Sequence, residues 1–259
     1  MFVYPEFFSP VAFEIFGLAI RWYSLSYILG FIFFYVFAST HLTHFNLDKK
    51  KLDDLFFYLF LSIIIGGRLG YVFFYNFSFY LSNPLDVLKV WQGGMSFHGA
   101  LLAVIITTIL FTKINSIKLF LIADLLSITA PLGIFLGRMS NFLNQELIGR
   151  KTEFFISIQY SGEEFYRHLS QIYEAIFEGL IPFIILLLIF KFLKNTPRGI
   201  ITSIFLINYA IVRFLIEYLR EPDIQIGLKF NLFTQGQLLS FPILIIGLVI
   251  LYICLSNKK

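Results

Sequence analysis

Charged residues and cysteine are both scarce in this sequence. Only 14% of the 259 residues are charged, against about 25% in a typical soluble domain, whereas 58% are hydrophobic. A single cysteine, Cys254, excludes a disulfide framework and a cysteine-based metal site. Any thiol chemistry must therefore use the thiol of another molecule.

Other features are also lacking. No stretch rich in glycine, proline or serine separates regions of different composition, so we expect one domain over residues 1–259. No basic patch interleaved with aromatic residues suggests a nucleic-acid partner. The first twenty residues contain no lysine or arginine, which argues against a cleavable signal peptide, and we expect the first membrane span to direct targeting. No internal repeat is apparent, which weighs against an inverted-repeat transporter.

Long apolar stretches dominate what is present. A helix needs about 20 mostly apolar residues to cross the hydrocarbon core of a bilayer. The sequence therefore predicts an all-α polytopic membrane protein with about seven transmembrane helices. The predicted spans are residues 19–38, 55–75, 97–112, 119–140, 172–193, 199–219 and 237–256.

The connections between these spans differ in lysine and arginine content, which predicts their orientation because cytoplasmic loops are enriched in both residues. One set of four short pieces carries ten: Lys49, Lys50, Lys51, Lys113, Lys118, Lys191, Lys194, Arg198, Lys258 and Lys259. The other set carries six over longer loops: Lys89, Arg150, Lys151, Arg167, Arg220 and Lys229. We expect the first set, with the C-terminus, to be cytoplasmic. The N-terminus is then periplasmic, and residues 141–171 form a periplasmic cap in which the alternating run 155–160 predicts a strand.

Four arginines, Arg21, Arg68, Arg138 and Arg213, fall within or beside the apolar spans. An arginine left at the bilayer centre costs roughly 2.5–3.5 kcal/mol on insertion scales, so each needs a compensating partner or a route to the interface. Arg21 and Arg68 lie near span ends, where the side chain can extend to the interface. Arg138 and Arg213 are the stronger candidates for function.

Arg213 belongs to a polar stripe, because Tyr209, Arg213 and Glu217 are spaced four residues apart in the sixth span. Such a stripe faces protein or water. It indicates either a functional arginine or a structural pair between Arg213 and Glu217. Glu174 and Glu178 are also four residues apart, at the start of the fifth span, and one of them is expected to pair with an arginine.

The fourth predicted span ends in a polar segment, residues 137–150. If the helix continues past Pro131, Arg138 and Asn141 share a face. A guanidinium is a rigid fork suited to phosphate oxygens, and asparagine offers a donor and an acceptor. We interpret the segment as a binding site for a polar head group. The alternative is an interfacial cap rich in hydrogen bonds.

Two further residues have open alternatives. His98 follows a glycine-rich turn into the third span, and an imidazole can take a proton near neutrality. A lone histidine is more often a satisfied polar group. Tyr23 lies at the predicted outer interface, where a place in the aromatic belt is the simpler explanation.

Several segments together resemble the bacterial prolipoprotein diacylglyceryl transferase family. The longest match is GRxxNFxNxExxGR, filled by Gly137, Arg138, Asn141, Phe142, Asn144, Glu146, Gly149 and Arg150. Further matches are Arg21-Trp22-Tyr23, Gly67-Arg68-Leu69-Gly70-Tyr71, Met95-Ser96-Phe97-His98-Gly99, Gln171-Ile172-Tyr173-Glu174, Arg213 to Asp223, and Gln235-Gly236-Gln237-Leu238-Leu239. They follow the family order over nearly the whole chain. Ser140 and Ala100 stand where the family usually has other small residues, which affects only local packing.

The resemblance implies transfer of a diacylglyceryl group from phosphatidylglycerol to the lipobox cysteine of prolipoprotein signal peptides, which forms a thioether and releases glycerol phosphate. This is the first step of bacterial lipoprotein maturation, at the outer side of the inner membrane. It implies membrane lipid as a partner, no metal and no cofactor.

The resemblance also suggests roles for residues. His98 is the candidate base, and Arg138 and Arg213 are candidate phosphate ligands. The other expected contributors are Asn141, Tyr23 and Glu146, which orient the glycerol moiety or the arginines, Arg68 and Gly149 in substrate binding, and Tyr209, Glu217 and Glu174 as support for the arginines. A channel or transporter and a non-catalytic lipid-binding scaffold are the rival readings, since intramembrane charges also mark ion paths. The sequence lacks a DGxxAR-type motif of phosphatidyl transferases, and it has no GxSx nucleophile suited to an intramembrane serine protease.

Overall fold

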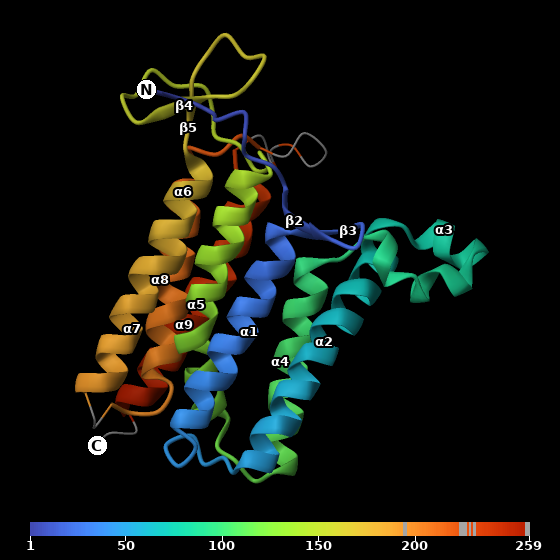
Figure 1. Ribbon diagram of the computed structural model, residues 1–259. Coiled ribbons are helices and arrows are strands. Elements are labelled where there is room, and N and C mark those ends of the chain that lie inside the picture. Colours follow the sequence, from blue (N-terminus) through green and yellow to red (C-terminus); the bar gives the residue numbers. More distant parts are fainter. Residues whose placement is uncertain (194–195, 223–226, 228, 230–231, 257–259) are drawn as a thin grey trace. The chain divides into compact units, whose positions relative to one another are not determined.

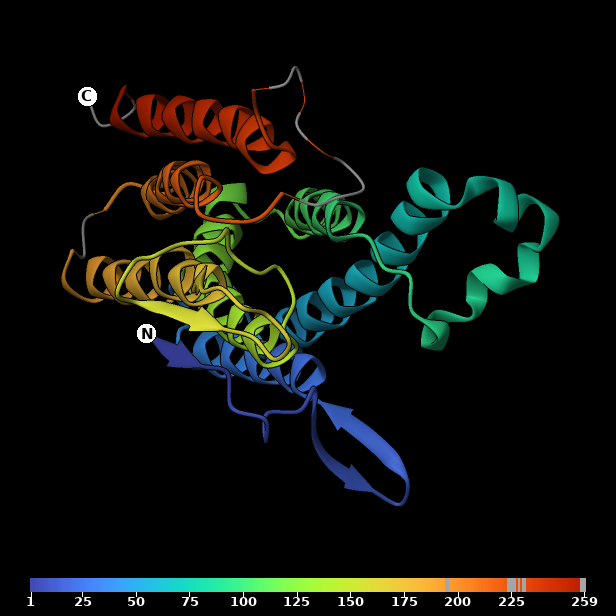
Figure 2. The same ribbon diagram turned by 90° about the horizontal axis from the view of Figure 1, so that it is seen from above.

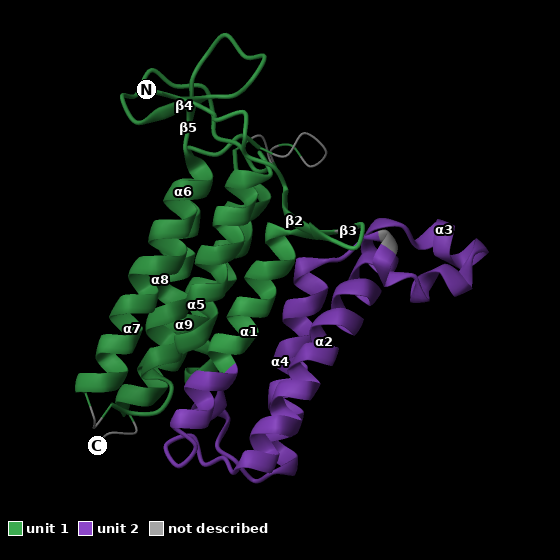
Figure 3. Ribbon diagram, viewed as in Figure 1, with its two compact units in different colours: residues 1–34, 124–259 green, residues 35–123 purple. Residues whose placement is uncertain are grey.

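The computed structural model describes residues 1–193, 196–222, 227, 229 and 232–256. The chain divides into two compact units (Figure 3). Unit 1 comprises residues 1–34 and 124–259, and unit 2 comprises residues 35–123. The single domain expected from the composition stays a prediction. Lys194, Lys258 and Lys259, used to predict the orientation, and Asp223, at the end of one motif, lie outside the described residues.

Long helices make up most of the described chain (Figure 1). They are α1 (Trp22–Thr40), α2 (Lys49–Tyr75), α4 (Phe97–Ile114), α5 (Leu119–Leu143), a continuous helix built from α6 (Ser170–Glu174), a π-helical turn (Ala175–Leu180) and α7 (Ile181–Phe192), then α8 (Ile200–Ile216) and α9 (Gln235–Ser256). Among the described residues, six helices are long and apolar enough to cross a membrane, and α8 is apolar but shorter. The chain is therefore an all-α polytopic membrane protein of about seven helices, as predicted.

The helix α5 runs without a break through Pro131 to Leu143. Proline lacks a backbone N–H and usually kinks or ends a helix. Here Pro131 is buried inside α5 and the helix continues. Arg138 and Asn141 therefore lie three residues apart on one face, as the sequence predicts for an uninterrupted helix.

Asp124 anchors α8 to α5. It lies inside α5, which begins at Leu119 as the predicted span 119–140 does, and its buried carboxylate caps the neighbouring helix. Its oxygens accept hydrogen bonds from the backbone amides of Gly199, at 2.7 Å, and Thr202, at 2.9 Å. Because a side-chain acceptor at a helix start satisfies otherwise unpaired N–H groups, this contact holds together the helices that carry Arg138 and Arg213.

Within unit 2, α2 and α4 pack closely through facing glycines. A Cβ atom on Gly66 would lie 2.6 Å from the carbonyl oxygen of Gly99, and one on Gly70 would lie 2.7 Å from the Cα atom of Gly99. Small residues of this kind let membrane helices approach each other. The segment between α2 and α4 contains α3 (Phe77–Ser82) and two 3-10 turns, Pro84–Leu88 and Val90–Gln92.

A small sheet lies beyond the ends of α5 and α6 (Figure 1). The strand β4 (Ser157–Gln159) falls within the run predicted as a strand and pairs antiparallel with β5 (Arg167–His168). The strand β1 (Phe2–Val3) adds to β4 in parallel, a pairing that the sequence did not predict. A separate hairpin, β2 (Val11–Ile15) and β3 (Leu18–Arg21), leads into α1 and projects to one side in Figure 2.

Tyr4 fastens this cap to α5. Its ring is buried among Ile158, Tyr160 and Leu169, and its hydroxyl donates to the carbonyl oxygen of Leu143 at 3.0 Å. The hydroxyl therefore satisfies one of the carbonyl groups left unpaired at the end of α5. The helix α5 extends to Leu143, so residues 141–143 of the predicted cap are helical, and the cap over 141–171 stays a prediction.

The cap contains one partly buried imidazole, that of His168. Its Nδ1 is buried and has no hydrogen-bond partner among the described residues. Burial lowers the pKa of His168 below its usual value of 6.5 because desolvation disfavours the charged ring. The unfolded chain then binds a proton at higher pH than the folded protein, so stability present above about pH 6.5 is lost as the pH falls toward the folded pKa.

We expect this effect in the midpoint of thermal unfolding of the detergent-solubilised protein, measured from about pH 8 to about pH 5. The midpoint should fall more steeply in the wild type than in His168→Gln, which cannot take up the proton. Parallel curves for the two proteins would contradict the assignment to His168.

Candidate active site

A buried ionic cluster of three arginines and three glutamates lies in unit 1. Its members are Arg138 of α5, Glu174 of α6, Glu178 of the π-helical turn, Arg213 of α8, and Glu217 and Arg220 directly after α8. Arg138 contacts Glu174 and Glu178 with nitrogen–oxygen distances of 3.0 Å each. Arg213 contacts Glu174, Glu178 at 3.5 Å and Glu217 at 2.7 Å. Arg220 lies 3.6 Å from Glu174.

The two bridging glutamates lie where the helix that carries them changes from α-helical to π-helical geometry. The π-helical turn Ala175–Leu180 begins directly after Glu174, and such turns are frequent at functional sites. Gly179 permits a close approach to α5, since a Cβ atom there would lie 2.7 Å from the backbone of Phe135. This contact brings Glu178 beside Arg138, which follows Phe135 by three residues.

The cluster balances its own charge. Glu174 and Glu178 are fully buried and Arg213 is 8% exposed, so the cost of removing these charges from water must be offset by their pairing. Removing one partner from a buried pair typically costs about 3–5 kcal/mol. The structure contains the Arg213–Glu217 pair expected from the sequence and adds two carboxylates that link Arg213 to Arg138.

A second polar group forms where the chain leaves α5. Gln145 and Leu147 have positive φ angles of 55° and 56°, a conformation that side chains other than glycine rarely adopt. The resulting turn directs Glu146 back to α5, where its Oε2 accepts a hydrogen bond from Nδ2 of Asn141 at 3.0 Å. The same Nδ2 lies 3.5 Å from the hydroxyl of Tyr23. Three predicted site residues, Tyr23, Asn141 and Glu146, are therefore contiguous.

Ser140, one of the departures from the family pattern, packs without strain in this region. Its hydroxyl lies 2.6 Å from that of Ser26 on α1, and both residues are buried. The extra hydroxyl therefore has a partner, which agrees with the expectation that the change affects only local packing.

Gly149 occupies a tight position between the cap and the end of α8. A Cβ atom at this residue would lie 2.1 Å from the carbonyl oxygen of His168. Gly149 also pairs with Arg220 of the ionic cluster as an isolated antiparallel bridge, and the amide of Arg150 donates to the carbonyl oxygen of Leu219 at 2.9 Å. A part for Gly149 in substrate binding stays a prediction. The structure shows that this residue has a packing role.

Unit 2 contains two of the predicted site residues. Arg68 is buried and donates hydrogen bonds to the carbonyl oxygens of Asp86, at 2.6 Å, Val87, at 2.9 Å, and Gly93, at 2.6 Å. Its guanidinium therefore organises the segment between α2 and α4. His98 is the second residue of α4 and is exposed.

Three residues in or beside the ionic cluster are not among the predicted site residues: Glu178, of which the sequence predicts only that it or Glu174 pairs with an arginine, Arg220 and Gly236. Glu178 follows Glu174 by four residues, and this spacing was the available signal. Arg220 follows Glu217 by three residues beyond the predicted end of the span. Gly236 lies in the Gln-Gly-Gln match, and a Cβ atom there would lie 2.1 Å from Oε1 of Glu217. The glycine therefore makes room for a carboxylate of the ionic cluster.

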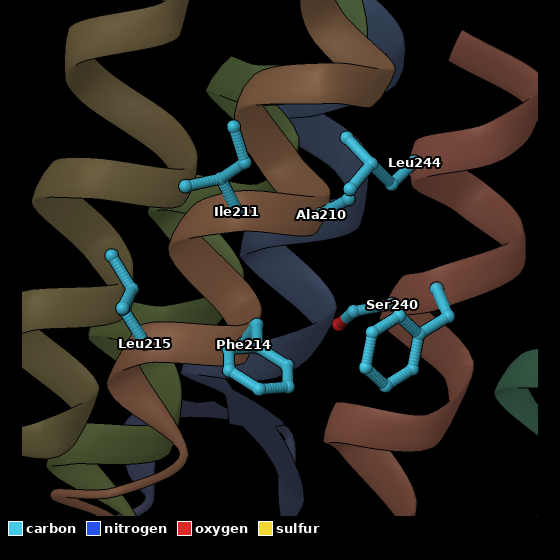
Figure 4. Close-up of a pocket in the computed structure, with 7 residues that line it drawn as sticks. Ala210, Ile211, Phe214, Leu215, Ser240 and Leu244 are labelled. Carbon is cyan, nitrogen blue, oxygen red and sulfur yellow. The ribbon is translucent and has the colours of Figure 1, made fainter. Parts of the chain in front are cut away.

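The two faces of α8 differ. On one face, Tyr209 precedes Arg213 by one helical turn and interacts with it electrostatically. A partly open apolar hollow of about 160 Å³ lies between α8 and α9 (Figure 4). It is lined by Ala210, Ile211, Phe214, Leu215, Ser240, Phe241 and Leu244. The Ser240 hydroxyl donates to the carbonyl oxygen of Gly236 in its own helix, at 2.8 Å, so the walls offer apolar contacts only.

Known proteins resemble this chain along almost its whole length. The family model described as prolipoprotein diacylglyceryl transferase matches residues 10–253. Phosphatidylglycerol–prolipoprotein diacylglyceryl transferase of Ehrlichia ruminantium is 46% identical over 253 residues, which cover 94% of this chain and 95% of the relative. The enzymes of the same name from Rickettsia felis and Aeromonas hydrophila are 44% and 43% identical to this chain. Each match spans 97% of this chain, together with 98% of the Rickettsia felis enzyme and 92% of the Aeromonas hydrophila enzyme. The chain therefore belongs to the prolipoprotein diacylglyceryl transferase family.

Proposed function

We propose that the chain transfers the diacylglyceryl group of phosphatidylglycerol to the thiol of the lipobox cysteine in a prolipoprotein. The observation that carries this proposal is that Arg138 and Arg213 are joined through shared carboxylates, in a chain whose relatives are named for this activity. Guanidinium groups form strong, directional hydrogen bonds with phosphate oxygens. A site of this kind inside a helical membrane protein suits a lipid that presents a phosphate head group.

The proposed reaction replaces one bond by another. The thiol loses its proton and its sulfur attacks the glyceryl carbon that carries the phosphate. A carbon–sulfur bond forms, the carbon–oxygen bond to phosphate breaks, and the electron pair leaves with the oxygen as glycerol phosphate. A free thiol has a pKa near 8.5, so a base and a positive environment assist the first step, and stabilising the charge of the leaving phosphate assists the second.

The residues take the following proposed roles. Arg138 and Arg213 bind the phosphate and stabilise its charge as the bond breaks, and His98 accepts the proton of the thiol. Three residues, Asn141, Tyr23 and Glu146, hold the glycerol moiety or the arginines in place. Two more, Arg68 and Gly149, shape the substrate site. The arginines are supported by Glu174, Glu217 and Tyr209. The contacts around Asn141 and Arg213 support these assignments.

We assign the protein to the bacterial inner membrane, with a periplasmic N-terminus and a cytoplasmic C-terminus. The excess of lysine and arginine in the connections on one side supports this orientation. The site then faces the periplasm, where the signal peptide of an exported prolipoprotein emerges. We expect no nucleic-acid partner.

Mass spectrometry can test the activity directly. Purified protein is incubated with phosphatidylglycerol and a peptide that contains a lipobox cysteine. We expect the mass of a diacylglyceryl group on that cysteine and none on a matched peptide with serine in its place. No adduct, alongside a related transferase that works under the same conditions, would refute the proposed function.

His98→Gln tests the assignment of the base. A well-placed general base typically contributes about 10²–10⁴-fold, so the initial rate of transfer should fall by a factor in this range. The dependence of the rate on pH should also flatten near neutrality, since glutamine takes up no proton. Unchanged rates and an unchanged pH profile at equal expression would show that His98 is not the base.

A further inference from the structure

Glu178 bridges the two arginines that the proposed function assigns to the phosphate. Its Oε2 lies 3.0 Å from Nη2 of Arg138, and its Oε1 lies 3.5 Å from Nη1 of Arg213. Glu174 makes the equivalent bridge with its own two oxygens. Each arginine therefore meets two fully buried carboxylates, and one of the two comes from a π-helical turn held against α5 by Gly179.

This bridging opposes tight anion binding. With all members ionised, the three arginines and three glutamates of the ionic cluster sum to zero charge. A bare pair of guanidinium groups in a buried site would attract any phosphate strongly, because charges interact more strongly away from water. The bridging carboxylates therefore weaken the attraction and also fix the separation of the two guanidinium groups.

Weaker anion binding helps the proposed reaction because its substrate and its product carry different negative charges. The phosphodiester of phosphatidylglycerol carries one negative charge, whereas a phosphate monoester carries about −1.5 to −2 at pH 7. The released glycerol phosphate would therefore bind a cationic arginine pair more tightly than the substrate does. A site without compensating carboxylates would retain its product.

We propose that Glu178 is a positioning residue that neutralises the Arg138–Arg213 pair and so permits release of the anionic product. This inference rests on the proposed function and assigns to Glu178 a role in product release. Glu178 does not touch the reacting atoms. It acts through the charge and the separation of the two arginines.

The test compares Glu178→Gln with Glu178→Asp in transfer assays with added glycerol phosphate and, separately, with inorganic phosphate. Removing the charge should lower the inhibition constant of glycerol phosphate about tenfold, equivalent to roughly 1.4 kcal/mol. The Michaelis constant for phosphatidylglycerol should fall less, and kcat should fall as product release slows. Glu178→Asp retains the charge and should keep an inhibition constant near that of the wild type.

Glu221→Gln is the matched control, because this exposed carboxylate pairs with Arg167 outside the ionic cluster, at 3.4 Å. It should change none of these constants. If Glu178→Gln and Glu178→Asp lose stability and activity alike, with the inhibition constant unchanged, the role is structural and the inference is wrong. Should Glu178→Gln fail to fold, Glu174→Gln provides the same comparison. A wild type without transferase activity would instead refute the proposed function, a separate outcome.

Discussion

Arg138→Lys is expected to lower kcat/KM for diacylglyceryl transfer by about 10²–10³-fold, the usual cost of removing one donor that stabilises charge in a transition state. Lysine keeps the positive charge but concentrates it on one nitrogen. Arg138 contacts Glu174 through Nη1 and Glu178 through Nη2, and one ammonium group cannot reproduce this planar fork. The geometry presented to a phosphate would therefore be lost although the charge remains.

The measurement is the initial rate of thioether formation over a range of phosphatidylglycerol concentrations, at matched amounts of folded protein. Arg198→Lys serves as the control, because Arg198 is exposed and precedes α8 at the end opposite the ionic cluster. Activity of Arg138→Lys near that of the control would mean that a point charge suffices. The proposed phosphate contact through the guanidinium fork would then be wrong.

The membrane helices could be predicted from the sequence because each is encoded locally. Crossing a bilayer requires a run of apolar residues, and such runs are rare elsewhere in a sequence. The ends of α1, α4 and α9 consequently lie within a few residues of the expected positions. The contact between Arg213 and Glu217 could also be predicted from the sequence, because helical spacing alone places the two residues on one face.

Contacts between segments that are distant in the sequence were harder to predict from it. Nothing in the local pattern around Glu178 indicates a π-helical turn, and Gly179 approaches Phe135, which lies more than forty residues away in the sequence, on another helix. The sequence suggested that one glutamate would pair with an arginine. The structure shows both glutamates between both arginines, which changes the expected electrostatics from a cationic clamp to a neutral one.

The two alternatives considered for Arg213 are therefore compatible. Its pair with Glu217 is structural in the sense that it joins buried charges near the end of α8. The same guanidinium is linked to Arg138 through Glu174 and Glu178, an arrangement compatible with the proposed phosphate site. An arginine paired on several sides is also well ordered, which is what a preorganised site needs.

Gly149→Ala is expected to destabilise the cap and, through it, the ionic cluster. The new Cβ atom would lie 2.1 Å from the carbonyl oxygen of His168, so one of the two backbone segments must move. Overpacking of this kind typically costs about 1–3 kcal/mol. Because Gly149 also bridges Arg220, the shift should reach the arginine next to Glu174, and a displacement near 1 Å can lower a rate about 10²-fold.

Thermal unfolding and transfer rates, measured on the same preparation, separate the two roles of Gly149. Packing predicts that the unfolding midpoint and kcat fall together, whereas direct substrate contact alone would raise the Michaelis constant and leave the midpoint unchanged. Gly133→Ala on α5 is the control, since a Cβ atom there meets nothing within 4 Å in the described part of the chain. An alanine in that helix should be neutral or slightly stabilising, because glycine costs roughly 0.5–1 kcal/mol more than alanine in a helix interior. If Gly149→Ala matched this control in stability, the cap would be more adaptable than its contacts indicate, and the substrate-binding role would become the better explanation.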